Sequence, residues 1–560
     1  MKNHMKHLLI ALLWLALPVL VDAQLTFTTN NDAITITGYI GGGDVDIPAT
    51  TNGYPVTSIK DFAFDTYENG ITSVEIPGSV TSIGEFVFYG CNSLSSITVD
   101  PSNPAYSSAG GVLFDEALTT LIQFPEGMGG SYTIPAGVTK IGDNAFSYSG
   151  ITSVNIPASV TSIGEGAFYG CGGLTSVNIP ASVTSIAAQA FENCAGLTGI
   201  NVDPSNPAYS SAGGVLFDEA QTTLIKYPES LGGSYTIPAS VTTIGDAAFI
   251  YSGITSVNIP DSVTSIGYNA FDYCVSLTSI TIPASVTSIG INAFVFCDNL
   301  TSVTIPDSVT SMGDEAFGYC DSLTSAYFRG NAPPDDGTVF DTDTATVYYL
   351  PGTTGWGSTF GSVPAVELPL FTSTTNGGAI TITGYNGSSG TVDIPATING
   401  YPVTSIAAYA FSATPFASVT IPASVTNIGD YAFAFSDSLT SAYFLGNAPP
   451  DDGTVFDTDP ATVYYLPGTT GWGSTFGSVP AVLWNPVIQS WGPNFGVDNH
   501  QFGFNITCSN NVTVVVEACD DLAGAVWTPL ETVTLTDGLY YFTDPNWLNY
   551  PSRFYGLGIP

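Results

Sequence analysis

Residues 151–173 read ITSVNIPASVTSIGEGAFYGCGG, and residues 174–196 repeat the pattern as LTSVNIPASVTSIAAQAFENCAG. The Ile-Pro dipeptides at 259, 282 and 305 continue the same 23-residue spacing further along the chain. A fixed period of this length is typical of solenoids, in which each repeat stacks on the next because one repeat cannot bury its apolar side alone. The sequence therefore predicts a mainly β repeat solenoid.

Each repeat is expected to contain one strand and one short turn. Leu174, Val177 and Ile179 follow the L-x-x-L-x-L strand signature of leucine-rich repeats. Pro180 ends that strand because it has no N–H for a ladder. The Ala190-Phe191 step is predicted to lie in a single helical or 3₁₀ turn, too short to be stable without its neighbours.

Longer duplications set the domain organisation. DPSNPAYSSAGGVLFDEA at 100–117 recurs at 203–220 and predicts an inserted loop and hairpin in each copy. SLTSAYFRGNAPPDDGTVFDTD at 322–343 returns almost unchanged at 438–459, which indicates two arrays closed by the same cap. We expect a signal peptide at 1–23, a long array at 24–366, a short array at 367–482 and a small C-terminal β-sandwich at 483–560.

The N-terminus and the charge bear on where the protein works. Lys2 and Lys6 precede an apolar run that ends in Val21-Asp22-Ala23, which is the layout of a cleaved secretory signal. No second long apolar segment follows, so no transmembrane segment is expected after cleavage. The formal net charge of −40 disfavours nucleic acid and anionic lipid as partners. We expect a secreted or cell-surface protein.

The repeat TSVTIPxSVTSIGxxAFxxCxxL resembles the BspA-like leucine-rich repeats of secreted and surface bacterial proteins. The resemblance covers residues 24–482, with Ile-Pro, Ser-Ile-Gly, Ala-Phe and Cys-x-x-Leu in the same order many times. It implies a right-handed solenoid with adhesive or antigenic roles, and it transfers no ligand-binding motif.

Residues for catalysis are scarce. Past the expected signal peptide the one histidine is His500, so neither a Ser-His-Asp nor a Cys-His set can be assembled. No Gly-rich phosphate loop is followed by lysine. We therefore predict no enzymatic activity and no required cofactor.

Two duplicated acidic loops are rich in Pro and Gly. Solvated turns are the simpler interpretation, and a weak Ca²⁺ site is the alternative, because close carboxylates suit that cation. Their residues are Asp335, Asp336, Asp341, Asp343, Asp451, Asp452, Asp457 and Asp459.

Six cysteines occupy one repeat position, where other repeats carry serine. A position that accepts both residues suits a small buried side chain, so we expect free thiols at Cys91, Cys171, Cys194, Cys274, Cys297 and Cys320. If the runs FGFNIT and VTVVVEAC form a hairpin, Cys508 lies near its turn and Cys519 at the far end of the second strand, too far apart to pair.

One aromatic position recurs near the Ala-Phe step. Four successive turns carry a ring there, and the residues are Tyr251, Tyr273, Phe296 and Tyr319. These rings either pack against the neighbouring coil or form an exposed edge that binds protein or sugar. Polar, uncharged residues such as Asn178 and Thr281 are expected to face outward from the strands.

We expect a non-enzymatic binding or adhesion protein that presents an extended repeat surface to an extracellular protein or polysaccharide. A structural spacer that carries the C-terminal module is the alternative, and an enzyme within that module is the third hypothesis.

Overall fold

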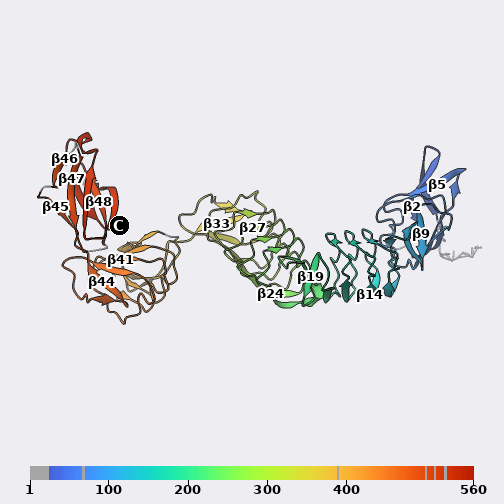
Figure 1. The fold of residues 1–560 in the computed structure, drawn as a ribbon, viewed down its shortest axis with the longest axis horizontal. Helices are drawn as coiled ribbons and strands as arrows, with labels where there is room; N and C mark the ends of the chain where they lie inside the picture. The colour runs from blue at the N-terminus through green and yellow to red at the C-terminus, as the bar shows by residue number, and fades with distance from the viewer. Residues whose placement is uncertain are drawn as a thin grey trace, which may run out of the picture. The chain divides into compact units, whose positions relative to one another are not determined.

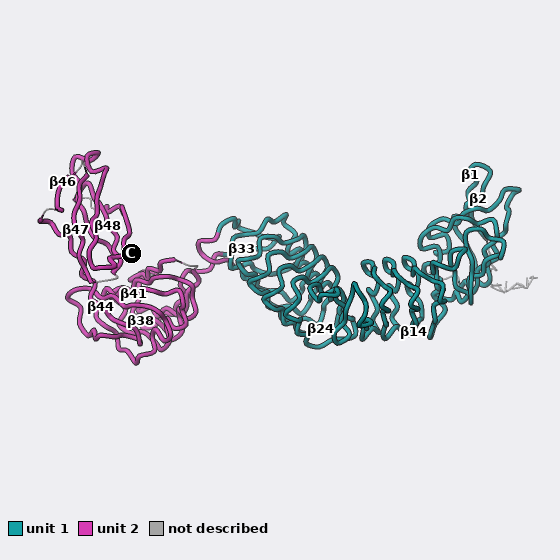
Figure 2. The backbone as a smooth tube through the Cα atoms, in the orientation of Figure 1, with its two compact units in different colours: residues 1–348, 354–366 teal, residues 349–353, 367–560 magenta. Residues whose placement is uncertain are grey.

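The computed structural model describes residues 24–65, 70–387, 390–492, 494–498, 501–509, 512–522 and 526–560. The chain divides into unit 1, Met1–Tyr348 with Thr354–Val366, and unit 2, Tyr349–Thr353 with Glu367–Pro560 (Figure 2). The expected signal peptide at 1–23 lies outside the described residues, as does His500.

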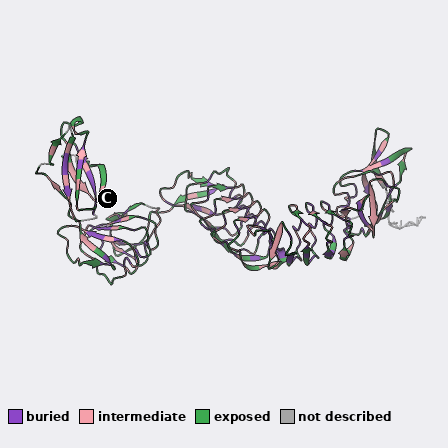
Figure 3. Ribbon diagram, in the orientation of Figure 1, coloured by how far each residue is buried: buried purple, intermediate pink, exposed green. Residues whose placement is uncertain are grey.

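Unit 1 is the predicted solenoid, in which each repeat forms one coil with short parallel strands (Figure 1). Strand β16 (Ser176–Ile179) pairs with β18 (Gly199–Val202) of the next coil, with Ser176 opposite Gly199. A second row of two-residue strands runs beside it. This row contains β13 (Lys140–Ile141), β15 (Ser162–Ile163), β17 (Ser185–Ile186), β23 (Thr243–Ile244), β25 (Ser265–Ile266), β27 (Ser288–Ile289) and β29 (Ser311–Met312). Val177 and Ile179 are buried and Asn178 is exposed, as the alternation requires. Buried and exposed segments alternate in this way along the coils of unit 1 (Figure 3).

A column of phenylalanine rings fills the interior of the coils, and we call it the inner column. Its residues are Phe146, Phe168, Phe191, Phe249, Phe271, Phe294 and Phe317. Phe271 and Phe294 stack with ring centroids 5.0 Å apart and planes 4° apart, and both are fully buried. One ring per coil therefore gives the solenoid a continuous apolar core.

The Ala-Phe steps are hydrogen-bonded turns and not the short helical turns expected from sequence. Gln189 and Asn193, on either side of Ala190-Phe191, have φ values of 56° and 57°, which interrupt any helical run. The Phe168 N–H donates to the Ala190 carbonyl of the next coil at 2.9 Å. The backbone bonds therefore join one coil to the next. Among the described residues only Glu229–Leu231 (η1) and Trp547–Asn549 (η2) form 3₁₀ helix.

The cysteine position is explained by a repeated hydrogen bond. The Cys171 thiol donates to the Phe146 carbonyl at 3.0 Å, and the Ser436 hydroxyl makes the equivalent bond to Phe411 at 3.2 Å. Either side chain satisfies a buried carbonyl, which is why both residues occur there. All eight cysteines are free thiols, as predicted.

Two inserted repeats interrupt the regular coils of unit 1. In the first, β9 (Tyr106–Ala109), β10 (Val112–Asp115) and β11 (Thr120–Gln123) pair in antiparallel order. In the second, β19 (Tyr209–Ala212), β20 (Val215–Asp218) and β21 (Thr223–Lys226) repeat the arrangement. The expected hairpins are thus present in both copies. After each hairpin an aromatic ring again stacks on the next coil, with ring centroids 5.0 Å apart from Phe124 to Phe146 and from Tyr227 to Phe249.

Antiparallel hairpins open both arrays. They are β1 (Gln24–Asn30) with β2 (Ala33–Ile40), and β34 (Phe371–Asn376) with β35 (Ala379–Tyr385). The same two-strand closure ends each array, formed by β32 (Thr359–Phe360) with β33 (Val363–Glu367) and by β43 (Thr475–Phe476) with β44 (Val479–Leu483).

The C-terminal module contains two antiparallel sheets. One joins β45 (Val487–Gln489), β46 (Gly496–Asp498), β47 (Gln501–Thr507) and β50 (Leu539–Asp544), and the other joins β48 (Val512–Cys519), β49 (Thr528–Leu535) and β51 (Phe554–Gly558). Strands β47 and β48 lie in different sheets, so the Cys508 segment is not the hairpin considered above. The β-sandwich assignment of this module stays a prediction. Across the described residues, no helix is long and apolar enough to span a membrane.

Candidate binding surface

The four recurring aromatic residues form one row of stacked rings on unit 1, and we call this row the outer ladder. Its members are Tyr251, Tyr273, Phe296 and Tyr319. Ring centroids lie 5.2 Å apart from Tyr251 to Tyr273, 4.4 Å from Tyr273 to Phe296 and 4.9 Å from Phe296 to Tyr319. Tyr251 and Tyr273 are 36% and 39% exposed, so the rings contact each other and solvent at once. The rings therefore pack against the neighbouring coils and also keep part of their surface exposed.

Every ring of the outer ladder stands on a left-handed residue. The φ values are 59° at Tyr251, 53° at Tyr273, 56° at Phe296 and 57° at Tyr319. The left-handed conformation costs an L-residue with a bulky side chain roughly 1–2 kcal/mol, a cost that Gly avoids and Asn reduces. Other repeats use those residues at the same position, namely Gly90, Gly170 and Asn193.

A second row of rings crosses the first inserted repeat, and sequence reasoning missed most of it. Tyr89 meets Tyr148 at 5.2 Å and 75°, and Tyr148 meets Tyr169 at 5.4 Å and 69°. In the FYGC turns at 88–91 and 168–171, glycine takes the left-handed position and the tyrosine moves one residue earlier. The shared FYGC motif is the sequence signal that could have identified these tyrosines.

The first inserted repeat also leaves a cavity of about 800 Å³, which we call the first notch. Tyr89, Tyr148 and Tyr169 line it together with the carboxylate of Glu126. This glutamate is only 5% exposed, and burial raises its pKa to about 7. A cavity with aromatic walls and a buried acid is a site where a ligand can be held in a fixed orientation.

The acidic cap loops are built as turns. Asp335 accepts hydrogen bonds from the Gly337 and Gly361 N–H groups at 2.8 and 2.7 Å, and Asp336 accepts one from Thr338 N–H at 3.0 Å. The second loop repeats these contacts, with Asp451 bonded to Gly453 and Gly477 and Asp452 bonded to Thr454.

The remaining acidic residues of these loops bond to the aromatic turns. Asp343 accepts from Cys320 N–H at 2.7 Å and Asp459 from Ser436 N–H at 2.8 Å. Burial raises the pKa of Asp343 to about 7 and that of Asp459 to about 6. The backbone carbonyls of Asp341 and Asp457 accept from Tyr319 and Phe435. Among the described residues, no three acidic, histidine or cysteine side chains are grouped to hold a metal ion, so calcium binding stays a prediction.

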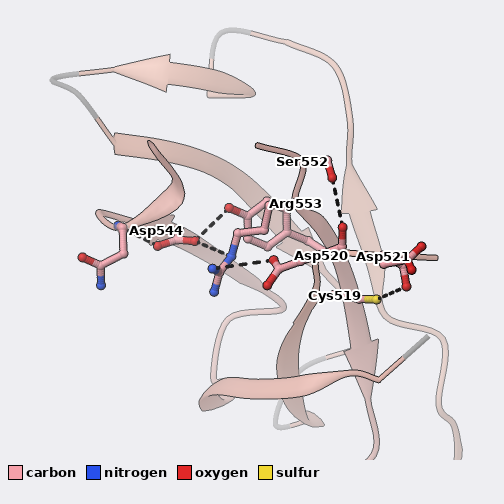
Figure 4. Close-up of polar contacts among 8 residues, drawn as sticks. Cys519, Asp520, Asp521, Asp544, Ser552 and Arg553 are labelled. Atoms are coloured by element: carbon pink, nitrogen blue, oxygen red, sulfur yellow. Dashed lines mark hydrogen bonds and ion pairs between the residues drawn. The ribbon is translucent and has the colours of Figure 1, made fainter. Parts of the chain in front are cut away.

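The C-terminal module holds one polar cluster (Figure 4). Arg553 Nε lies 3.0 Å from Asp544 Oδ2, which also accepts the Tyr555 hydroxyl at 2.9 Å, and Asn546 N–H donates to Asp544 Oδ1 at 2.8 Å. The Arg553 guanidinium lies 3.8 Å above the Tyr550 ring. Both oxygens of Asp544 are thus occupied by contacts that tie η2 to β51. The cluster has the features of a structural clamp.

Stacked coils with short parallel strands, almost no helix and a continuous apolar interior define a leucine-rich-repeat solenoid. Residues 47–129, 130–232, 230–333 and 389–449 match the family described as BspA type leucine-rich repeat region, in six copies. These matches cover more than half of the chain, which belongs to this family. No curated protein matches the chain.

Solved structures with similarity to the chain are bacterial repeat proteins. One is a leucine-rich cell surface protein from Faecalibacterium prausnitzii, 30% identical over 59% of this chain and 95% of that one, with a TM-score of 0.43. A second is the pneumococcal vaccine antigen PcpA, 16% identical over 83% and 98%, with a TM-score of 0.39. A third is a leucine-rich-repeat protein from Eubacterium ventriosum, 21% identical over 74% and 92%, with a TM-score of 0.34.

Proposed function

We propose that this protein is a non-enzymatic binding protein that acts outside the cell, where unit 1 adheres to an extracellular protein or polysaccharide through its outer ladder. One observation carries the proposal. Four consecutive coils place a partly exposed aromatic ring on a left-handed residue, where Gly or Asn would be easier to accommodate.

Folding alone does not favour an aromatic residue at this left-handed position. Stacking of two aromatic rings contributes about 0.5–1.5 kcal/mol beyond their buried area, which is similar to the cost of the left-handed conformation. The net gain for the folded state is therefore small. Strained residues of this kind concentrate at binding sites, because a partner supplies the contacts that offset the strain.

The outward strand positions of unit 1 also suit a repetitive partner. The outward strand positions at Asn178, Asn258 and Thr304 are exposed and uncharged, and Asn201 donates to Asn178 on the neighbouring coil at 3.3 Å. Rings about 5 Å apart on successive coils can make many weak contacts that add through effective concentration. The partner class is a matrix protein or an extended polysaccharide.

The test is a binding screen of residues 24–560 against matrix proteins and polysaccharides. The variant Tyr251→Asn/Tyr273→Asn/Tyr319→Asn keeps residues that tolerate the left-handed conformation and removes three rings. The matched control is Tyr409→Asn in unit 2, which is also exposed and left-handed with φ of 59°.

We expect the triple variant to lose at least tenfold in affinity for any partner found, while the control binds like the natural protein. Equal binding by the triple variant would refute the role of the ladder. A natural protein that binds nothing in the screen would instead favour the structural-spacer hypothesis.

A further inference from the structure

The two inserted repeats have the same design and differ in what fills them. The first notch has a volume of about 800 Å³, and its counterpart in the second inserted repeat, the second notch, has about 70 Å³. Every residue that lines the second notch has its counterpart 103 positions earlier in the lining of the first. The two notches therefore occupy equivalent positions in the two inserted repeats and differ in the volume that their side chains leave open.

The second notch contains a cation that belongs to the protein itself. Lys226 is 7% exposed, and its Nζ lies 3.7 Å from Glu229 Oε1. Glu229 also accepts backbone hydrogen bonds from Asn193 and Cys194. Burial lowers the pKa of Lys226, and the negative charges of Glu229 and Glu192 oppose that decrease.

The first notch keeps the acid and lacks the cation. Glu126, the counterpart of Glu229, accepts a hydrogen bond from Gly90 N–H at 3.0 Å through Oε1. Its Oε2 is buried and has no hydrogen-bond partner among the described residues. Gln123 stands where Lys226 stands in the other copy, and its Nε2 donates to the Phe124 carbonyl at 3.0 Å.

The walls of the first notch suit an organic cation. Glu85, Asp143, Glu165 and Glu192 line it along with Glu126, against the single cation of Lys140. Lys140 is half exposed and lies 4.0 Å from Asp143. The rings of Tyr89, Tyr148 and Tyr169 provide apolar faces for a methylene stem and attract a cation electrostatically.

We propose that the first notch binds the primary ammonium group of a lysine side chain on a protein partner, the same group that Lys226 supplies internally to the second notch. This inference rests on the proposed binding role and names the chemistry of the partner. A lysine stem along the tyrosines would bring its ammonium to Glu126 Oε2, which supplies the missing ion pair. The net charge of −40 would attract such a partner to the protein.

The experiment uses two small probes that share a four-carbon side chain and differ in whether it carries a terminal ammonium group. Nα-acetyl-L-lysine methylamide carries the ammonium, and Nα-acetyl-L-norleucine methylamide ends in a methyl group. Saturation-transfer NMR and calorimetry on residues 24–560 at pH 8 should give a Kd on the order of 1 mM for the lysine probe. The norleucine probe should bind at least tenfold more weakly.

Two variants test whether the lysine probe binds in the first notch. Gln123→Lys gives the first notch the cation that Lys226 supplies to the second notch, and it should lower the affinity for the lysine probe at least tenfold. Glu126→Gln keeps the shape of the acid, removes its charge and should do the same. Gln501→Lys adds the same charge at an exposed position of the C-terminal module that does not line either notch, and it is the matched control, with binding within about twofold of the natural protein.

Equal affinity for both probes, or full lysine-probe binding by Gln123→Lys and Glu126→Gln, would overturn the inference. If the notch variants lose probe binding but still bind the partner of the outer ladder, the result supports separate sites for the two functions. If the natural protein binds no lysine probe while the ladder still binds its partner, the inference fails and the proposed function stands.

Discussion

Two columns of aromatic rings pass through the same four coils of unit 1, two residues apart in each turn. The two columns differ in burial and in backbone conformation. Phe271 of the inner column is fully buried, whereas Tyr273 of the outer ladder is 39% exposed and left-handed. Both columns stack with centroids about 5 Å apart. The period of the coil dictates the spacing of both, but only the inner column is needed to bury apolar surface. The comparison separates residues kept for folding from residues available for binding.

The strongest test of this comparison removes one ring of the inner column. Phe271→Ala should lower the free energy of unfolding by about 3–5 kcal/mol, because stacked coils above and below prevent the cavity from closing. Urea unfolding followed by fluorescence measures the loss. Phe271→Leu is the control, with a loss nearer 1 kcal/mol. A loss below 1 kcal/mol for the alanine variant would show that the column is not the core.

The buried acid between the two columns should make stability depend on pH. Burial raises the pKa of Asp272 to about 7, with Glu192 adding to the rise, and one of its oxygens has no partner among the described residues. The folded protein therefore holds this proton more tightly than the unfolded chain, so stability falls as pH rises from about 4 to 7. The contribution is on the order of 2–4 kcal/mol.

The variant Asp272→Asn removes this dependence and should stabilise the protein at pH 8. Asp261→Asn, which changes an exposed carboxylate, is the control for the general effect of lowering the negative charge. Thermal unfolding at pH 5 and pH 8 distinguishes the two. If both variants show the same pH profile, the pH dependence comes from overall charge and not from the buried acid.

The thiol position should show a smaller effect. Cys297 donates to the Phe271 carbonyl at 3.3 Å, so Cys297→Val leaves a buried acceptor unsatisfied at a cost of about 1–3 kcal/mol. Cys297→Ser keeps a donor, as Ser436 does in unit 2, and should cost less. The urea midpoints of unfolding rank the stability of the two variants. Equal stability of the valine and serine variants would show that the hydrogen bond does not stabilise the fold.

The smallest stability effect is expected in the outer ladder. Tyr273→Asn loses ring stacking and gains relief of the left-handed strain, so its unfolding free energy should change by less than about 1 kcal/mol in either direction. Calorimetry of this variant beside Phe271→Ala tests the comparison directly. A loss as large as that of the phenylalanine variant would place Tyr273 in the core.

The repeat period predicted the solenoid, the inserted hairpins and the free thiols, because each depends on residues within one coil or on its direct neighbour. The alternation of Val177, Asn178 and Ile179 was likewise enough to assign inside and outside. The stacking row from Tyr251 to Tyr319 also followed from the period, although its exposure did not.

Other features depended on backbone conformation or on distant copies. The Ala-Phe steps were expected to be helical, and the left-handed residues that prevent it, such as Gln189, carry no strong sequence signal. The notch lies at an inserted repeat, where Tyr89 meets Tyr148 across 59 positions of sequence. The importance of Gln123 emerges only when it is compared with Lys226 in the other copy.

The left-handed position also bears on how such a chain can diverge. It carries Gly, Asn, Tyr or Phe in different coils, as at Gly90, Asn193, Tyr251 and Phe296, while the phenylalanine two residues earlier stays the same. A single codon change there can add or remove one exposed ring without disturbing the coil. Lineages can therefore lengthen, shorten or interrupt the row of exposed rings one repeat at a time, at a position where we expect mutation to have little effect on folding.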